Sequence, residues 1–219
     1  MPRVRVMVAI ALCSLLAAPA AVPCTRGYSY AGLYAPRKST GIAATLTMLH
    51  EPTVSAGHVA AWVGVGGPRV GPNGADEWLQ VGLASFPGSA GAELYYELAQ
   101  PGHAPEYHEL APGIGAGDRV RASVLELPFA RDTWVVVTSR GMAGPFYLPK
   151  SHSAWAPIAT AESWNAGGAS CNRYAYLFDG VQVGRRDGSW KPLRHGLKLL
   201  DPGPRLRRTD TSSFSVSAP

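Results

Sequence analysis

The chain has 219 residues, of which 46% are hydrophobic, and it contains 25 Gly and 19 Pro with a formal net charge of +5. This hydrophobic fraction excludes an intrinsically disordered chain, and the frequent turn residues between short apolar runs favour an all-β protein. The basic excess lies late in the chain, where eight Lys or Arg occur between Arg185 and Arg208. Because they are spread among Gly and Pro without interleaved aromatic residues, we interpret them as a solvated face and expect no nucleic-acid partner.

Residues 1–20 have the pattern of a secretory signal peptide. Arg3 and Arg5 precede an apolar stretch at 6–18, and Ala18-Pro19-Ala20 is a small-residue cleavage site. The apolar stretch is shorter than the roughly 20 residues that a membrane-spanning helix needs. We therefore expect a secreted, extracellular protein with no membrane contact after the signal is removed.

Two cysteines, Cys24 and Cys171, remain once the signal is removed. Two cysteines in an exported chain most simply form a disulfide, although two free thiols are the alternative. No linker or internal repeat divides residues 21–219, so we expect a single domain there.

Apolar and polar residues alternate with a period of two in segments bounded by Gly, Pro or Asp, which is typical of half-buried strands. In chain order the predicted strands are Tyr28–Tyr34 (at a sheet edge, after an N-terminal arm), Ile42–Leu49, His58–Val65, Glu77–Phe86, Ala92–Leu98, Arg119–Leu127, Thr133–Arg140, Ile158–Trp164, Tyr174–Val183 (broken near Asp179-Gly180) and Ser212–Ser217. No segment after the signal has helical periodicity. Strands of this length with short connections predict an all-β sandwich of two antiparallel sheets.

Gln80 lies on a predicted strand whose two faces differ. Leu79, Val81 and Leu83 form an apolar face that we expect to pack between the sheets. The other face carries Trp78, Gln80 and Gly82, and glycine there would leave room for a substrate backbone. This composition fits the floor of a concave groove, whereas a Gln considered alone is more often simply exposed.

Glu162 follows the same logic, because it shares a strand face with Trp164. Trp62 and Glu97 also occur on strands with a polar or glycine-containing face. For Trp62, a place in the core is an equal alternative. His103 and His108 flank a Pro/Glu-rich segment, which we interpret as a solvated loop in preference to a metal site.

Four motifs in this order resemble those of the glutamic peptidases, or eqolisins, as in a divergent bacterial-type member. They are Trp-Val-Gly-Val from Trp62, Leu-Gln-Val-Gly around Gln80, Tyr-Tyr-Glu ending at Glu97, and Ala-Glu at Glu162. The resemblance implies a jelly-roll or concanavalin-like sandwich of two curved antiparallel sheets.

The resemblance also implies a function. Gln80 and Glu162 would form a catalytic dyad that hydrolyses polypeptides at acidic pH, with Glu162 as the general base and Gln80 stabilising the oxyanion. Trp62, Trp78, Glu97 and Trp164 would contact the substrate. No metal or cofactor is implied, and we expect a monomer.

Two positions depart from the family pattern. Gly66 and Ala84 stand where the family usually has Asp residues that orient the dyad. The alternative is therefore a non-catalytic sandwich module that binds a glycan or peptide in the same groove.

Overall fold

The computed structural model describes residues 27–35, 37–68, 75–152, 154–168 and 171–219. In these ranges no helix is long and apolar enough to cross a membrane. The expected signal peptide (1–20) and Cys24 lie outside the described residues. Export and the Cys24–Cys171 disulfide therefore stay predictions.

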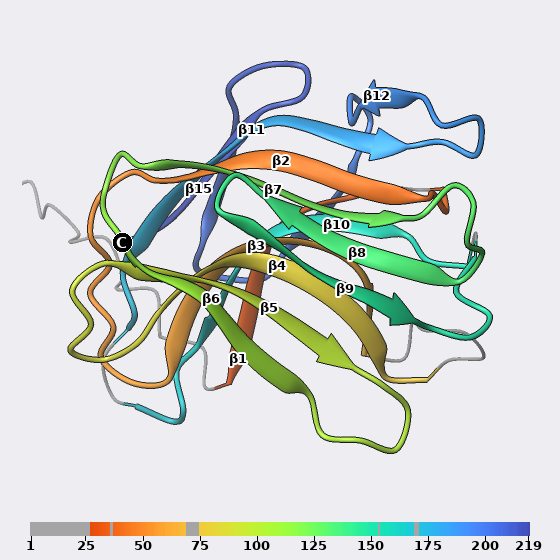
Figure 1. Ribbon diagram of the computed structural model, residues 1–219. Coiled ribbons are helices and arrows are strands. Elements are labelled where there is room, and N and C mark those ends of the chain that lie inside the picture. The colour runs from red at the N-terminus through yellow and green to blue at the C-terminus, as the bar shows by residue number, and fades with distance from the viewer. Residues whose placement is uncertain (1–26, 36, 69–74, 153, 169–170) are drawn as a thin grey trace, which may run out of the picture.

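The described strands form two antiparallel sheets that pack face to face (Figure 1). Sheet A has the strand order β13 (Leu197–Leu200), β1 (Tyr28–Tyr34), β10 (Pro157–Trp164), β3 (His58–Gly67), β4 (Glu77–Ser85), β5 (Ala92–Ala99) and β6 (Glu106–Ile114). Sheet B has the order β14 (Arg205–Arg208), β15 (Phe214–Ala218), β11 (Tyr174–Gly184), β2 (Gly41–Met48), β7 (Arg119–Glu126), β8 (Thr133–Thr138) and β9 (Gly141–Tyr147), and β12 (Trp190–Pro192) pairs with β11. The prediction of an all-β sandwich of two antiparallel sheets is confirmed.

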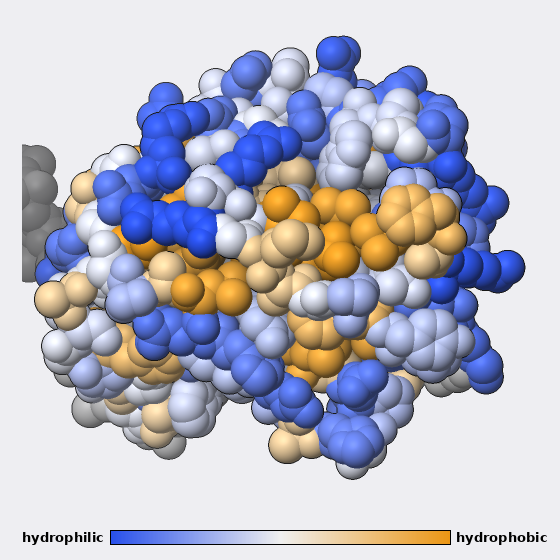
Figure 2. All heavy atoms as spheres, in the orientation of Figure 1, coloured by the Kyte–Doolittle hydropathy of each residue, from blue (hydrophilic) through white to orange (hydrophobic). Residues whose placement is uncertain are grey.

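The core lies between the two sheets and is built by the predicted alternation. Leu79, Val81 and Leu83 of β4 are fully buried there. Trp134 and Trp155 are also fully buried, with ring centroids 5.4 Å apart. In the view of Figure 1, apolar side chains are visible between the two layers (Figure 2). Burial of these side chains is the main source of stability for such a sandwich.

The predicted strands are all present, but the prediction for the edges was wrong in two ways. β1 has the predicted bounds but is not an edge strand, because β13 pairs with it. The strands that do lie at the sheet edges, β13 and β6 in sheet A and β14 and β9 in sheet B, were missed. β6 and β9 contain Pro, and most of their residues are exposed, so neither shows the alternation of a half-buried strand.

The expected loop around His108 was therefore also wrong. His108 lies on β6, where its ring stacks on Tyr96 at a centroid distance of 4.6 Å. His103 lies in the turn that precedes this strand. The break predicted near Asp179-Gly180 is confirmed as a register shift between Asp179 and Gln182 in β11.

Candidate functional site

Strand register brings the predicted site residues to the same face of sheet A. Directly opposed residues of an antiparallel pair point to one face. Gln80 is opposite Gly64 on one side and Glu97 on the other. Glu162 is opposite Ala60 of β3, which is in phase with Trp62 and Gly64. The amide of Gln80, the two carboxylates and the indoles on these strands therefore all point away from sheet B.

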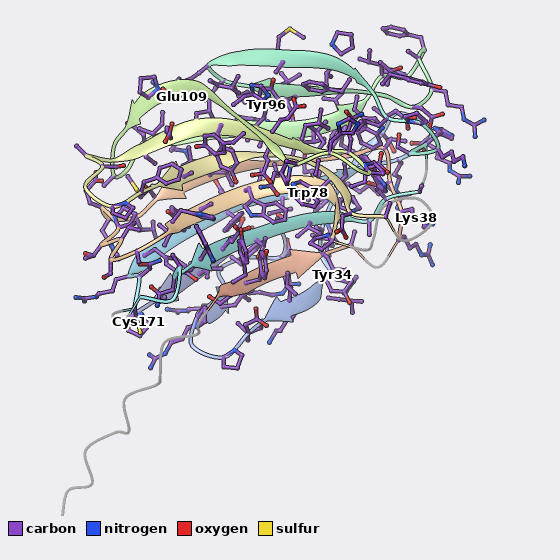
Figure 3. The ribbon with its side chains drawn as sticks, turned by 90° about the horizontal axis from the view of Figure 1, so that it is seen from below. Tyr34, Lys38, Trp78, Tyr96, Glu109 and Cys171 are labelled. Atoms are coloured by element: carbon purple, nitrogen blue, oxygen red, sulfur yellow. The ribbon has the colours of Figure 1, made fainter. Side chains whose placement is uncertain are left out.

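A cavity of about 550 Å³ opens on this face. Its described lining consists of Tyr28, Tyr30, His58, Trp62, Gly67, Pro68, Trp78, Gln80, Glu97, Pro105, Ile158, Glu162 and Leu199. Figure 3 shows Trp78 near the middle of the face. Of the six residues predicted for the site, only Trp164 is absent from the lining. It is 38% exposed and stacks on Tyr28 with a centroid distance of 5.9 Å.

Glu162 is held by two side chains of β3. The indole N–H of Trp62 donates to Oε2 at 3.0 Å, and His58 Nε2 lies 2.9 Å from Oε1. Glu162 is 8% exposed, and Trp62 is 7% exposed. Trp62 lines the cavity, so its predicted contact with substrate stays a prediction, and its indole N–H also orients the carboxylate of Glu162. Each carboxylate oxygen keeps a second lone pair for a water molecule.

Gln80 is fixed by a tyrosine on the neighbouring strand. Its Nε2 donates to the hydroxyl of Tyr95 at 3.1 Å, and Gln80 is 7% exposed. The side chain of Tyr95 is buried, which raises its pKa well above 10, and the charges of Glu162 and Glu97 raise it further. Tyr95 therefore stays neutral and can accept the amide hydrogen. A primary amide has a second N–H hydrogen, which remains available to a ligand.

Glu97 is the second carboxylate of the cavity. It accepts a hydrogen bond of 2.7 Å from the indole N–H of Trp78. Burial raises the pKa of Glu97, the Trp78 hydrogen bond lowers it, the charge of Glu162 raises it and His58 lowers it, with a net upward shift. Trp62 and Trp78 thus perform equivalent tasks, each binding one of the two carboxylates.

Sequence reasoning missed several members of the site. His58 shares a face of β3 with Trp62, so its position in the strand was an available signal. Tyr30 was not identifiable, because only the pairing of β1 with β10 places it opposite Glu162. Burial raises the pKa of Tyr30 far above 10, and Glu162 adds to this shift.

The glycines and small residues of this face do not leave space for substrate, contrary to the prediction for Gly82. A Cβ on Gly82 would lie 2.6 Å from Trp62 Cβ. Gly66 has a φ of +85°, and a Cβ there would meet Trp78 Cα at 2.9 Å. Ala84 is 2% exposed and packs with Trp62 and Tyr95. An Asp at position 66 would therefore be strained, and an Asp at position 84 would be buried.

Within the part of the chain that the structure describes, no group of three or more His, Cys, Asp or Glu side chains could hold a metal ion.

The sequence matches no protein-family model and no curated protein. Among solved structures, the chain is similar to scytalido-glutamic peptidase with a transition-state analogue inhibitor, at 16% identity and a TM-score of 0.60, over 89% of this chain and 98% of that one. It is also similar to SCP-B, a member of the eqolisin family in complex with the tripeptide Ala-Ile-His, at 15% identity and a TM-score of 0.57, with the same coverage of both chains. A carbohydrate-binding module, CBM66 from Bacillus subtilis, follows at 9% identity and a TM-score of 0.41. The chain thus has the fold of the eqolisin peptidases, as a distant structural relative.

Proposed function

We propose that this protein is a secreted glutamic endopeptidase that hydrolyses polypeptides at acidic pH through Gln80 and Glu162. The observation that carries the proposal is that this amide and this carboxylate line a single cavity, each held by a buried neighbour. Similarity in fold to two eqolisin peptidases supports it but does not establish chemistry.

In the proposed reaction, ionised Glu162 takes a proton from water as the water oxygen attacks the scissile carbonyl carbon. The second N–H of Gln80 donates to the oxygen that becomes negative. Glu162 then returns the proton to the amide nitrogen, the C–N bond breaks, and a carboxylic acid and an amine leave. The indole N–H of Trp62 holds Oε2 of Glu162 and so keeps the carboxylate oriented throughout the reaction.

The acidic optimum follows from the second carboxylate. Glu97 and Glu162 line the same cavity, and the pKa of Glu97 is raised by burial and by the charge of Glu162. Protonating Glu97 removes one of the two negative charges from the cavity. We therefore expect turnover to be fastest below neutrality.

The test is digestion of an unfolded protein between about pH 3 and pH 8 in the presence of pepstatin. Glu162→Gln should lower kcat by at least about 100-fold, since it removes the general base. Gln80→Ala should lower it by about 100-fold or more, as expected for loss of an oxyanion donor. Glu109→Gln is the matched control, because Glu109 is an exposed carboxylate on sheet A outside the cavity lining. Full activity of Glu162→Gln would contradict the proposal.

A glycan-binding module is the second candidate. The specific observation in its favour is the exposed pair Tyr28 and Trp164, which are 54% and 38% exposed and stack on each other. Aromatic rings presented in this way can pack against sugar rings. If wild-type protein cleaves no polypeptide at any pH, while Trp164→Ala abolishes binding of soluble oligosaccharides measured by calorimetry, this function is the correct one.

A further inference from the structure

A second cavity, of about 760 Å³, lies between the segment that follows β1 and the β11–β12 hairpin. Its cationic lining residues come from two parts of the chain that are far apart in sequence. They are Arg37, Lys38, Arg185, Arg186, Lys191 and Arg194, joined by His195. No residue in this lining belongs to the described lining of the Gln80/Glu162 cavity, so the two sites are separate.

Backbone contacts fix the two segments to each other. The N–H of Thr40 donates to the carbonyl of Gly184 at 3.3 Å, and the Thr40 hydroxyl donates to the carbonyl of Arg185 at 3.1 Å. In the hairpin, Val183 of β11 pairs directly with Lys191 of β12. Figure 3 shows Lys38 beyond the Tyr34 end of β1, on the side of the molecule away from Cys171. These contacts fix the backbone of the two segments that carry the cationic groups.

The lining contains no Asp or Glu. The nearby carboxylate of Asp187 lies in the β11–β12 turn, where it accepts hydrogen bonds from the N–H and hydroxyl of Ser189 at 2.9 and 2.6 Å. These bonds lower the pKa of Asp187, and the charges of Arg185 and Lys191 lower it further. The lining thus presents six cations, and Asp187 is a nearby carboxylate outside it.

Four of the six cations are not neutralised by an ion pair with a described residue. In the described part of the chain, Arg37, Lys38, Lys191 and Arg194 take part in none of the ion pairs. Figure 2 shows strongly hydrophilic side chains along the right-hand edge of the molecule, the side on which Figure 1 places the β11–β12 hairpin. Collecting like charges around a concave surface raises the local potential and attracts anions.

We propose that this cavity binds a compact polyanion that carries two or more phosphate or sulfate groups. Arg side chains donate in pairs to such oxyanions, and Lys supplies further point charges. The volume is that of a small-molecule site, for which about 300–1,000 Å³ is typical. A single nucleic-acid strand fits less well, because its successive bases stack on several aromatic rings. The described lining of this cavity contains no Phe, Tyr or Trp, and a smaller adjoining cavity adds one, Trp190.

A smaller adjoining cavity extends the site. It shares Gly184, Arg185 and Arg186 with the first one and adds Arg131 and Trp190, together with the carboxylate of Glu126, which lies 2.9 Å from His152 Nδ1. The indole of Trp190 is 38% exposed, which allows it to contact a sugar ring that carries the anionic groups.

Calorimetry with full-length protein tests the proposal. It also distinguishes a polyphosphate from a sulfated sugar as the source of the anionic groups. The probes are tripolyphosphate, a sulfated heparin tetrasaccharide and a single-stranded oligonucleotide, each at about 0.1 M salt. We expect a dissociation constant below about 1 mM for at least one of the first two probes. The double variant Lys38→Gln with Lys191→Gln should weaken that binding about tenfold or more, as loss of two charged hydrogen-bonding groups predicts. Activity on polypeptides should be unchanged, so failure of the proposed peptidase function leaves this test intact.

The matched control is Arg121→Gln with Arg173→Gln, which removes the same charge from exposed positions outside both basic cavities. It should retain wild-type affinity for the polyanion. Equal weakening by both double variants would mean attraction by net charge alone and would overturn the proposal. So would the absence of binding to both compact probes, or an affinity for the oligonucleotide that rises with its length and exceeds theirs. Circular dichroism of both variants confirms that each remains folded.

Discussion

Glu162 and Glu97 each receive a hydrogen bond from an indole N–H. Trp62 donates to Glu162, and Trp78 donates to Glu97. Only Glu162 is assigned a reacting role, so the two indoles provide a comparison within one cavity. Replacement of either Trp by Phe removes the donor and keeps an aromatic ring.

We predict that Trp62→Phe lowers kcat roughly tenfold or more with little change in KM. A hydrogen bond to a charged group contributes about 1.5–3 kcal/mol, and its loss here leaves the general base poorly oriented. The loss of kcat in Trp78→Phe should be at least about tenfold smaller than the loss in Trp62→Phe, because Glu97 is not the proposed base. Steady-state kinetics on a quenched peptide at acidic pH makes the comparison. An equal loss in both variants would mean that the indoles act only on packing.

At the scale of the element, the close approach of β3 and β4 depends on glycine. Gly82 is opposite Trp62, and a Cβ at Gly82 would lie 2.6 Å from Trp62 Cβ. Any side chain at this position must therefore move the strand that carries Trp62. The glycine affects both stability and the orientation of Glu162.

We predict that Gly82→Ala lowers the free energy of unfolding by about 1–3 kcal/mol, as is typical when extra volume is forced into a packed region. Gly115→Ala is the control, because a Cβ there meets only Asp118 Oδ2 at 3.9 Å. It should change stability by less than about 0.5 kcal/mol. Urea unfolding at constant pH measures both variants. If the two have the same midpoint, β3 can yield and the close approach is not required.

These elements also show how far the sequence alone could predict the structure. The central strands were predictable, since apolar residues alternate with a face of different composition, as in β4, even though both faces of β4 are largely buried. The edge strands β6 and β9 were not, because their pattern is set by exposure on both faces. Gln80, Glu97, Trp62 and Glu162 could be assigned to matching faces from period-two alternation. Their hydrogen bonds, and the partnership of His58 with Glu162, depend on the strand register, which no local pattern encodes.

At the scale of the whole molecule, ionisable groups make stability depend on pH. Burial raises the pKa values of Glu77, Glu93 and Glu97 above 4.5, and at Glu93 the neighbouring Glu109 adds to the shift. The folded state therefore binds more protons than the unfolded state above about pH 4.5, and the free energy of unfolding falls as pH rises through this range. Asp179 acts in the opposite sense. Hydrogen bonds from Arg119 and Ser213 lower its pKa below 3.8, and its stabilising contribution is lost as pH falls through the lowered value.

We predict that the melting temperature is highest near about pH 4 and falls between about pH 4.5 and pH 7. Differential scanning calorimetry across this range measures it. Glu97→Gln should flatten the fall, because the amide oxygen can still accept from Trp78 but carries no charge that burial penalises. A melting temperature that rises from pH 4.5 to pH 7 would contradict the prediction. An equally steep fall in Glu97→Gln would mean that Glu97 does not cause the pH dependence. Stability in acid is what the proposed peptidase needs, since we expect its turnover to be fastest below neutrality, where the half-buried Glu97 destabilises the fold least.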